Sequence, residues 1–108
     1  MKKMPADYKY VEDMYDDNYY PDHLVDKVKD VIVKVVCFIE EGGHSKDEIQ
    51  AEFDKAMDAI NDLQDDFWEA DSEIETVARD SIGVTVIDIL KHFEIDIDHE
   101  EAMRNRDW

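Results

Sequence analysis

Apolar residues recur every three or four positions along most of the chain, the spacing of one face of an α-helix. The pattern is clearest over Asp22–Glu41, and its stripe consists of Leu24, Val28, Ile32, Val35 and Ile39. Several of these residues are β-branched and would suit a strand. Because a strand of this length would far exceed the usual roughly 3–10 residues, the pattern predicts a helix. Gly42-Gly43 is expected to end it, since glycine adopts the left-handed cap conformation without penalty.

Two more long helices are predicted after this one, each introduced by a capping box. Ser45 and Glu48 have the spacing in which the serine side chain and the N3 glutamate cap each other's backbone amides. The helix that follows runs to about Glu69, with a buried stripe of Ile49, Phe53, Met57, Ile60, Leu63 and Phe67. Ser72 and Glu75 repeat the pattern and predict a helix to about Phe93.

That last helix is apolar over most of its circumference, because Val84 and Ile87 add to its main stripe. The pattern predicts a central helix or, alternatively, one that contributes to a dimer interface. Gly83 lies inside it, and a glycine there costs about 1 kcal/mol relative to alanine. We expect it to mark a close approach by another helix.

The two ends of the chain predict shorter elements. Residues 1–6 are expected to fray, and residues 7–17 form a short first helix that Pro21 separates from the next. Asp98 can cap a last short helix from His99 to about Asn105. The sequence therefore predicts an all-α fold: a single antiparallel bundle of four main helices plus a short C-terminal helix, in one domain spanning residues 1–108.

Composition restricts the protein class. Of the 108 residues, 44% are hydrophobic, which is enough to close one core. No apolar run approaches the roughly 18 residues of a membrane span, and the N-terminus lacks the apolar stretch of a signal peptide. Cys37 is the single cysteine, which favours a reducing, cytoplasmic location. The net charge of −18 repels nucleic acid and anionic membranes and attracts basic proteins, or, as the alternative, serves only to keep the protein soluble.

The acidic residues of the helix after Ser45 gather opposite its apolar stripe. At about 100° per residue they form a ridge, made of Asp47, Asp54, Asp58, Asp62, Asp65 and Glu69. Aromatic residues also adjoin acids, and such residues anchor many interfaces, although they could equally fasten the first helix to the bundle. The predicted partner-binding residues are Tyr15, Tyr19, Tyr20, Asp54, Asp58, Asp62, Asp65, Trp68 and Glu69.

Catalytic motifs are not evident, and the sequence predicts neither an enzyme nor a cofactor or metal site. Asp62/Asp65 and Asp66/Glu69 have the i, i+3 spacing with which a helical phosphohydrolase holds Mg²⁺, but most of these residues belong to the outward ridge. Asp88 and His92 stand one turn apart and could form a polarised general base or a hydrogen-bonded core pair. Cys37 has no histidine placed beside it by local spacing.

Two segments resemble an uncharacterised bacterial family of small acidic helical proteins, the domain-of-unknown-function family 5713. One is Met14-Tyr15 with Tyr20-Pro21-Asp22 and the following residues 24–29, and the other is the ending from Ile95 to Trp108. The resemblance implies a helical fold and a bacterial source, and supplies no activity. In addition, Tyr19-Tyr20-Pro21 among acids looks like the element with which colicin-nuclease immunity proteins grip their basic toxins.

These observations support three hypotheses. The leading one is a binding module that sequesters or neutralises a basic protein, in an immunity-like or regulatory role. The alternatives are a metal-dependent phosphohydrolase that uses Asp62, Asp65, Asp66 and Glu69, and a homodimeric structural module that uses the apolar surface of the helix before Phe93.

Overall fold

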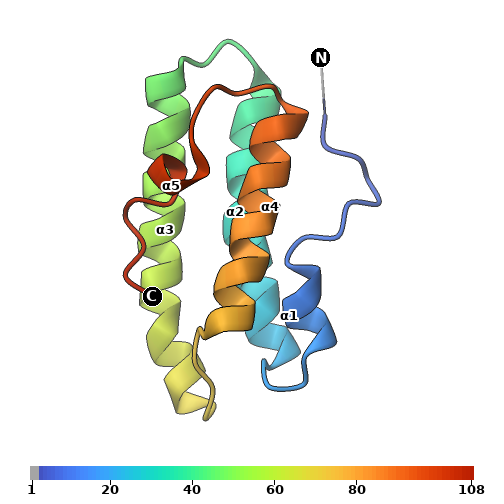
Figure 1. The fold of residues 1–108 in the computed structure, drawn as a ribbon, viewed down its shortest axis with the longest axis vertical. Coiled ribbons are helices and arrows are strands. Elements are labelled where there is room, and N and C mark those ends of the chain that lie inside the picture. Colours follow the sequence, from blue (N-terminus) through green and yellow to red (C-terminus); the bar gives the residue numbers. More distant parts are fainter. Residues whose placement is uncertain (1–2) are drawn as a thin grey trace.

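Three long helices and two short ones make up the part of the chain that the computed structural model describes, residues 3–108 (Figure 1). The long helices are α2 (Asp22–Glu41), α3 (Lys46–Glu69) and α4 (Thr76–His92), and the short ones are α1 (Glu12–Asp16) and α5 (His99–Ala102). Residues 3–108 contain no strand, so the all-α prediction is confirmed. None of the helices described is long and apolar enough to cross a membrane.

The predicted short first helix is present, but it is shorter than the expected residues 7–17. It begins only at Glu12, because the preceding Val11 has a left-handed backbone (φ 43°) that cannot continue a helix. Val11 is nevertheless fully buried, and its amide donates a hydrogen bond to Thr85 Oγ1 of α4 at 3.1 Å. A tertiary contact therefore decides where α1 starts.

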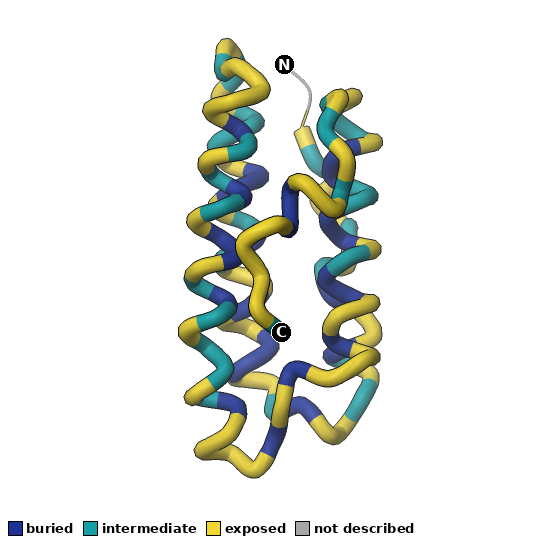
Figure 2. The backbone as a smooth tube through the Cα atoms, turned by 60° about the vertical axis from the view of Figure 1, so that its left-hand side comes forward, coloured by how far each residue is buried: buried dark blue, intermediate teal, exposed yellow. Residues whose placement is uncertain are grey.

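The long helices lie alongside one another, with the short helices inserted between them. α2 and α3 are antiparallel and share the most extensive contact, while α1 packs between α2 and α4 and α5 between α3 and α4 (Figure 1). The buried faces of α2, α3 and α4 point inward (Figure 2). The largest fully buried side chains include Phe53, Phe67, Ile32, Ile60, Ile82 and Ile89. The short helices thus bridge α4 to the α2–α3 pair.

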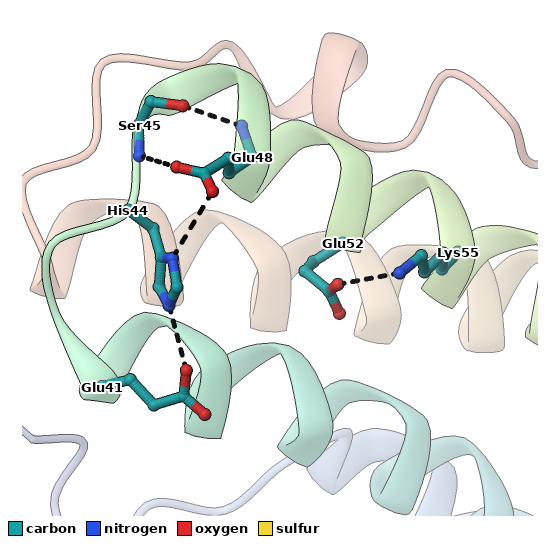
Figure 3. A network of polar contacts seen from close by, with 6 residues as sticks. All are labelled: Glu41, His44, Ser45, Glu48, Glu52 and Lys55. Atoms are coloured by element: carbon teal, nitrogen blue, oxygen red, sulfur yellow. Dashed lines mark hydrogen bonds and ion pairs between the residues drawn. The ribbon is translucent and has the colours of Figure 1, made fainter.

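The loop between α2 and α3 has the predicted capping box, and α2 ends before Gly42 as predicted, although the ψ of Gly42 (165°) is not that of the left-handed cap conformation. Gly42 follows α2 with a positive φ of 77°, and Ser45 and Glu48 form the capping box at the start of α3 (Figure 3). Ser45 Oγ accepts from the Glu48 amide at 3.2 Å, and the Ser45 amide donates to Glu48 Oε1 at 2.9 Å. His44 Nε2 lies 3.0 Å from Glu41 Oε1, and its ring stacks on Phe38. Local hydrogen bonds therefore fix this turn.

The second capping box, predicted at Ser72 and Glu75, is wrong. Helix α4 starts later, at Thr76, and has no side-chain cap from Glu75. Ser72 is buried, and its hydroxyl donates instead to the Tyr19 carbonyl at 3.0 Å. The N3 amide of α4, that of Ala78, donates to the Tyr20 hydroxyl at 3.2 Å. A side chain from a distant loop thus caps the helix in place of the local serine.

The N-terminal segment is fastened to the long helices. Met1 and Lys2 lie outside the described residues, but the Met4 amide donates to Glu40 Oε2 at 2.9 Å. His92 Nε2 lies 2.7 Å from the Lys3 carbonyl oxygen. Polar groups of α2 and α4 therefore contact the backbone of Lys3 and Met4, within the segment predicted to fray.

The surroundings of α4 differ from the prediction. A Cβ added at Gly83 would meet no atom within 4 Å, so the expected close helix approach is wrong. Val77 and Val84 are 40% and 55% exposed, so α4 is not a central helix. The opposite face of α4, with Ile82 and Val86, is buried in one core with residues of α2 and α3, so the helix has one covered face and one open face.

Candidate protein-binding surface

Two loops meet at one end of the molecule. The loop from α1 to α2 and the loop from α3 to α4 lie together at the lower end in Figure 1. Ser72 joins them through its hydrogen bond to the Tyr19 carbonyl, and Tyr20 joins them through its bond from the Ala78 amide. The Tyr20 ring also meets the Phe67 ring edge-on, with centroids 6.3 Å apart. These contacts hold the two loops in one surface.

The α3–α4 loop turns sharply because Asp71 adopts the left-handed conformation, with φ 58°. The Asp71 amide donates to the Trp68 carbonyl at 3.0 Å and the Ser72 amide to the Phe67 carbonyl at 2.8 Å. This is the hydrogen-bond pattern of a Schellman motif, with an aspartate where glycine is usual. The turn ends α3 and directs the chain back beneath Tyr19.

Tyr19 and Trp68 are exposed side by side on this surface. Their exposed fractions are 42% and 53%, and both line a shallow depression together with Asp71, Ser72 and Glu73. Tyr19 packs edge-on against Tyr20, with ring centroids 5.1 Å apart. Desolvation, and then the charges of Glu75 and Glu73, raise the pKa of the Tyr19 phenol. The depression is thus aromatic in part and electronegative.

The stretch of chain around the depression carries acidic side chains and no basic ones. Residues 56–78 contain eight aspartates and glutamates and no lysine, arginine or histidine. One of the acids, Asp66, receives an ion pair from Lys27 of α2 at 3.0 Å. Asp62, Asp65 and Glu69 are exposed and make no side-chain hydrogen bond or ion pair with another described residue. The second half of the predicted ridge is therefore an open carboxylate surface.

In the first half of the ridge, Asp54 and Asp58 contact the C-terminal segment of the chain, while Asp47 stays exposed. Arg104 donates to both carboxylate oxygens of Asp54, Nε to Oδ1 at 3.1 Å and Nη2 to Oδ2 at 2.7 Å. Its hydrogen bonds lower the pKa of the Asp54 carboxyl. Asn105 Nδ2 donates weakly to Asp58 Oδ1 at 3.4 Å. Asp54 is therefore neutralised within the molecule, which sequence reasoning missed.

Side chains of α3 also bind the backbone of this segment. Gln50 Nε2 donates to the Glu101 carbonyl and Asn61 Nδ2 to the Asn105 carbonyl, both at 2.8 Å. The Asp107 amide donates back to Asn61 Oδ1 at 3.0 Å. In the sequence, the arginines near the end of a very acidic chain were the only indication that this segment contacts α3. They are too far from α3 along the chain for residue spacing to predict the contact.

The other predicted aromatic residues have structural roles. Tyr20 is only 3% exposed, so it is a core residue and leaves the set of surface anchors. Tyr15 is half-buried and donates its hydroxyl proton to Asp26 Oδ1 of α2. Burial and this hydrogen bond raise the pKa of Tyr15. Tyr15 therefore fastens α1 to α2, as the alternative interpretation of the aromatic residues expected.

The other candidate groups make separate contacts, and no hydrogen bond joins Asp88 to His92 among the described residues. Asp88 accepts a hydrogen bond from the Tyr8 hydroxyl at 2.7 Å, while His92 holds the Lys3 carbonyl, so each fastens the N-terminal segment to α4. Burial, followed by this hydrogen bond, raises the pKa of Tyr8. Cys37 is exposed on α2. Within residues 3–108, no three His, Cys, Asp or Glu side chains are grouped so that they could hold a metal ion.

Comparison with known proteins identifies one family that the chain matches. Residues 4–108 match the sequence model of a family of unknown function, DUF5713. No curated protein and no solved structure matches the chain significantly. The match spans nearly the whole chain and confirms the resemblance described from the sequence.

Proposed function

The chain belongs to the family of unknown function DUF5713, and we propose that it binds a basic protein through the acidic surface around Tyr19 and Trp68. The observation that supports this proposal is the pair of exposed aromatic rings in one depression, on a stretch that has eight acids and no basic residue. Tyrosine and tryptophan are frequent anchors of protein interfaces, and surrounding charge of one sign accelerates the approach of an oppositely charged partner.

The binding surface consists of Tyr19, Asp62, Asp65, Trp68, Glu69, Asp71 and Glu73. Asp54 and Asp58 stand outside it, because the C-terminal segment already contacts their carboxylates. A carboxylate without an ion pair can attract the lysine or arginine of a partner, whereas the charge of Asp54 is already neutralised by Arg104. The lone exposed cysteine is compatible with a reducing, cytoplasmic compartment for this interaction.

The test is an affinity series with basic proteins that co-purify with the chain at low salt. Binding should weaken steadily with added salt, because exposed charges are screened. Tyr19→Ala combined with Trp68→Ala should weaken it by at least about tenfold, the loss of roughly 1.4 kcal/mol expected when interface anchors are truncated. The matched control is Val77→Ala with Val84→Ala, which removes two exposed apolar side chains of α4.

A charge pair completes the experiment. Asp65→Asn with Glu69→Gln should make the affinity for the basic protein less dependent on salt. Asp30→Asn with Asp96→Asn removes two other exposed carboxylates and should change that dependence little. If no basic protein binds at low salt, or if the aromatic and valine variants bind equally, the proposed surface is wrong.

A homodimer is a second candidate, and one observation favours it. Val77 and Val84 are seven positions apart, hence on one face of α4, and are 40% and 55% exposed. Such a face would be buried by a second copy of the chain. Sedimentation at micromolar concentration tests this, and a monomeric mass there contradicts it. Nothing in the described residues favours the phosphohydrolase alternative.

A further inference from the structure

A groove runs between α4 and the C-terminal segment. Its walls come from α4, chiefly Arg79, Gly83 and Val84, and from the end of the chain, chiefly Met103, Arg106 and Trp108. Its volume of about 690 Å³ is within the usual range of roughly 300–1,000 Å³ for small-molecule sites. In Figure 2 the C-terminal segment passes between α3 and α4. On α4, the side chain of Val84 beside the groove is 55% exposed.

The groove holds two of the three arginines of this acidic protein. Arg104 is paired with Asp54, but Arg79 and Arg106 have no carboxylate partner among the described residues. Arg79 Nη2 donates only to the Thr76 hydroxyl at 3.2 Å, and Arg106 lies over the Trp108 ring, 6.0 Å from its centroid. A planar guanidinium has a donor fork that matches a carboxylate or phosphate, so these groups can accept an anion.

The rest of the lining is largely apolar and open. Val84, Ile87, Met103 and Trp108 supply apolar surface, and Val84 is 55% exposed. Asp80 is the one acidic side chain among the described lining residues, and His99 is paired with Asp98. Trp108 Nε1 is buried without an acceptor among the described residues, so packing and Arg106 rather than a hydrogen bond hold the ring.

Gly83 adds an independent observation. It lies inside a helix, where glycine costs about 1 kcal/mol relative to alanine, and a Cβ there would meet nothing within 4 Å. Packing within the chain therefore gives no reason for a glycine, although it borders the groove. The absent side chain widens the space between the two arginine-bearing walls.

We propose that this groove binds a small organic anion with an apolar body, whose carboxylate or phosphate group is held by Arg79 and Arg106. The apolar body lies over Gly83 and contacts Val84 and Trp108. The site is separate from the acidic surface around Tyr19 and Trp68, and it takes a ligand of opposite charge.

The experiment uses the fluorescent aryl sulfonate anilinonaphthalene sulfonate as the probe. The folded chain should bind it saturably with one probe per chain. Naphthoate and naphthyl phosphate should displace it, the stronger of the two identifying the preferred head group, and neutral naphthol should displace it more weakly. Arg79→Gln with Arg106→Gln should weaken binding by at least about tenfold, since a charge-assisted hydrogen bond contributes more than a neutral one.

Two further variants make the result specific. Lys34→Gln with Lys55→Gln removes two exposed cations from the α2–α3 face and should leave binding unchanged. Gly83→Leu fills the groove without changing charge and should weaken binding about as much as the arginine variant, while circular dichroism shows a folded helix bundle.

Several outcomes overturn the proposal. The proposal is wrong if the folded chain binds the probe without saturation, or if the lysine variant loses as much affinity as the arginine variant. It is also wrong if Gly83→Leu binds the probe as tightly as the parent chain does. If Gly83→Leu instead changes the mass in sedimentation from dimer to monomer, the groove is covered by a second copy and is not a ligand site.

Discussion

Tyr20 should stabilise the fold through a single hydroxyl group. The Tyr20 oxygen accepts a hydrogen bond from the Ala78 amide, the third amide of α4, in a buried position. The first amides of a helix have no acceptor within the helix, so they depend on caps of this kind. Tyr20→Phe keeps the ring that packs against Phe67 and removes only the acceptor.

The expected loss is about 1–2 kcal/mol of unfolding free energy. Removing an N-terminal cap costs about 0.5–2 kcal/mol, and leaving a buried amide without an acceptor costs about 1–3 kcal/mol. These are two descriptions of one missing bond, so they are not added together. For a domain of this size the loss should lower the melting temperature by about 4–8 °C.

Urea unfolding followed by circular dichroism measures the effect. Tyr19→Phe is the matched control, because Tyr19 is 42% exposed and the variant keeps the backbone carbonyl that accepts the hydrogen bond from Ser72. Tyr19→Phe should be neutral within about 0.5 kcal/mol, as for most surface substitutions. If Tyr20→Phe is as stable as Tyr19→Phe, the Tyr20 hydroxyl does not cap α4 and the account of that helix start fails.

Three further outcomes can be checked by thermal unfolding. Gly83→Ala should stabilise the protein by about 1 kcal/mol, because a Cβ meets no neighbour, and a destabilised variant would show that the helix is packed there. Ser45→Ala should cost about 1 kcal/mol through loss of the α3 capping box, and an unchanged stability would contradict that role. Hydrogen bonds from Arg104 lower the pKa of the Asp54 carboxyl below its ordinary 3.8. The stability that this ion pair gives to the fold should therefore be complete above pH 3.8 and lost as the pH falls through the lowered pKa. Arg104→Gln should therefore lose stability at pH 7 relative to the parent and match it at the acid end, and a difference that persists there would refute the coupling.

The sequence predicted correctly those features that depend on residues three or four positions apart. The stripe of Leu24, Val28 and Ile32 predicted α2 with its observed limits, and all three residues are buried. The capping box at Ser45 formed as predicted, since both its partners lie within one turn. The family resemblance likewise rested on local segments and proved correct over residues 4–108.

The tertiary structure alone decided how similar local patterns were used. Ser72 has the same spacing to an acid as Ser45, yet its hydroxyl is drawn to the Tyr19 carbonyl 53 positions away. Tyr19 and Tyr20 are adjacent and alike, but one is 42% exposed and the other 3%. Asp54 and Asp65 share a helix face, but only Asp54 meets an arginine, 50 residues along the chain. Such contacts depend on how the helices pack and on where the C-terminal segment crosses α3, and no spacing within one helix encodes that.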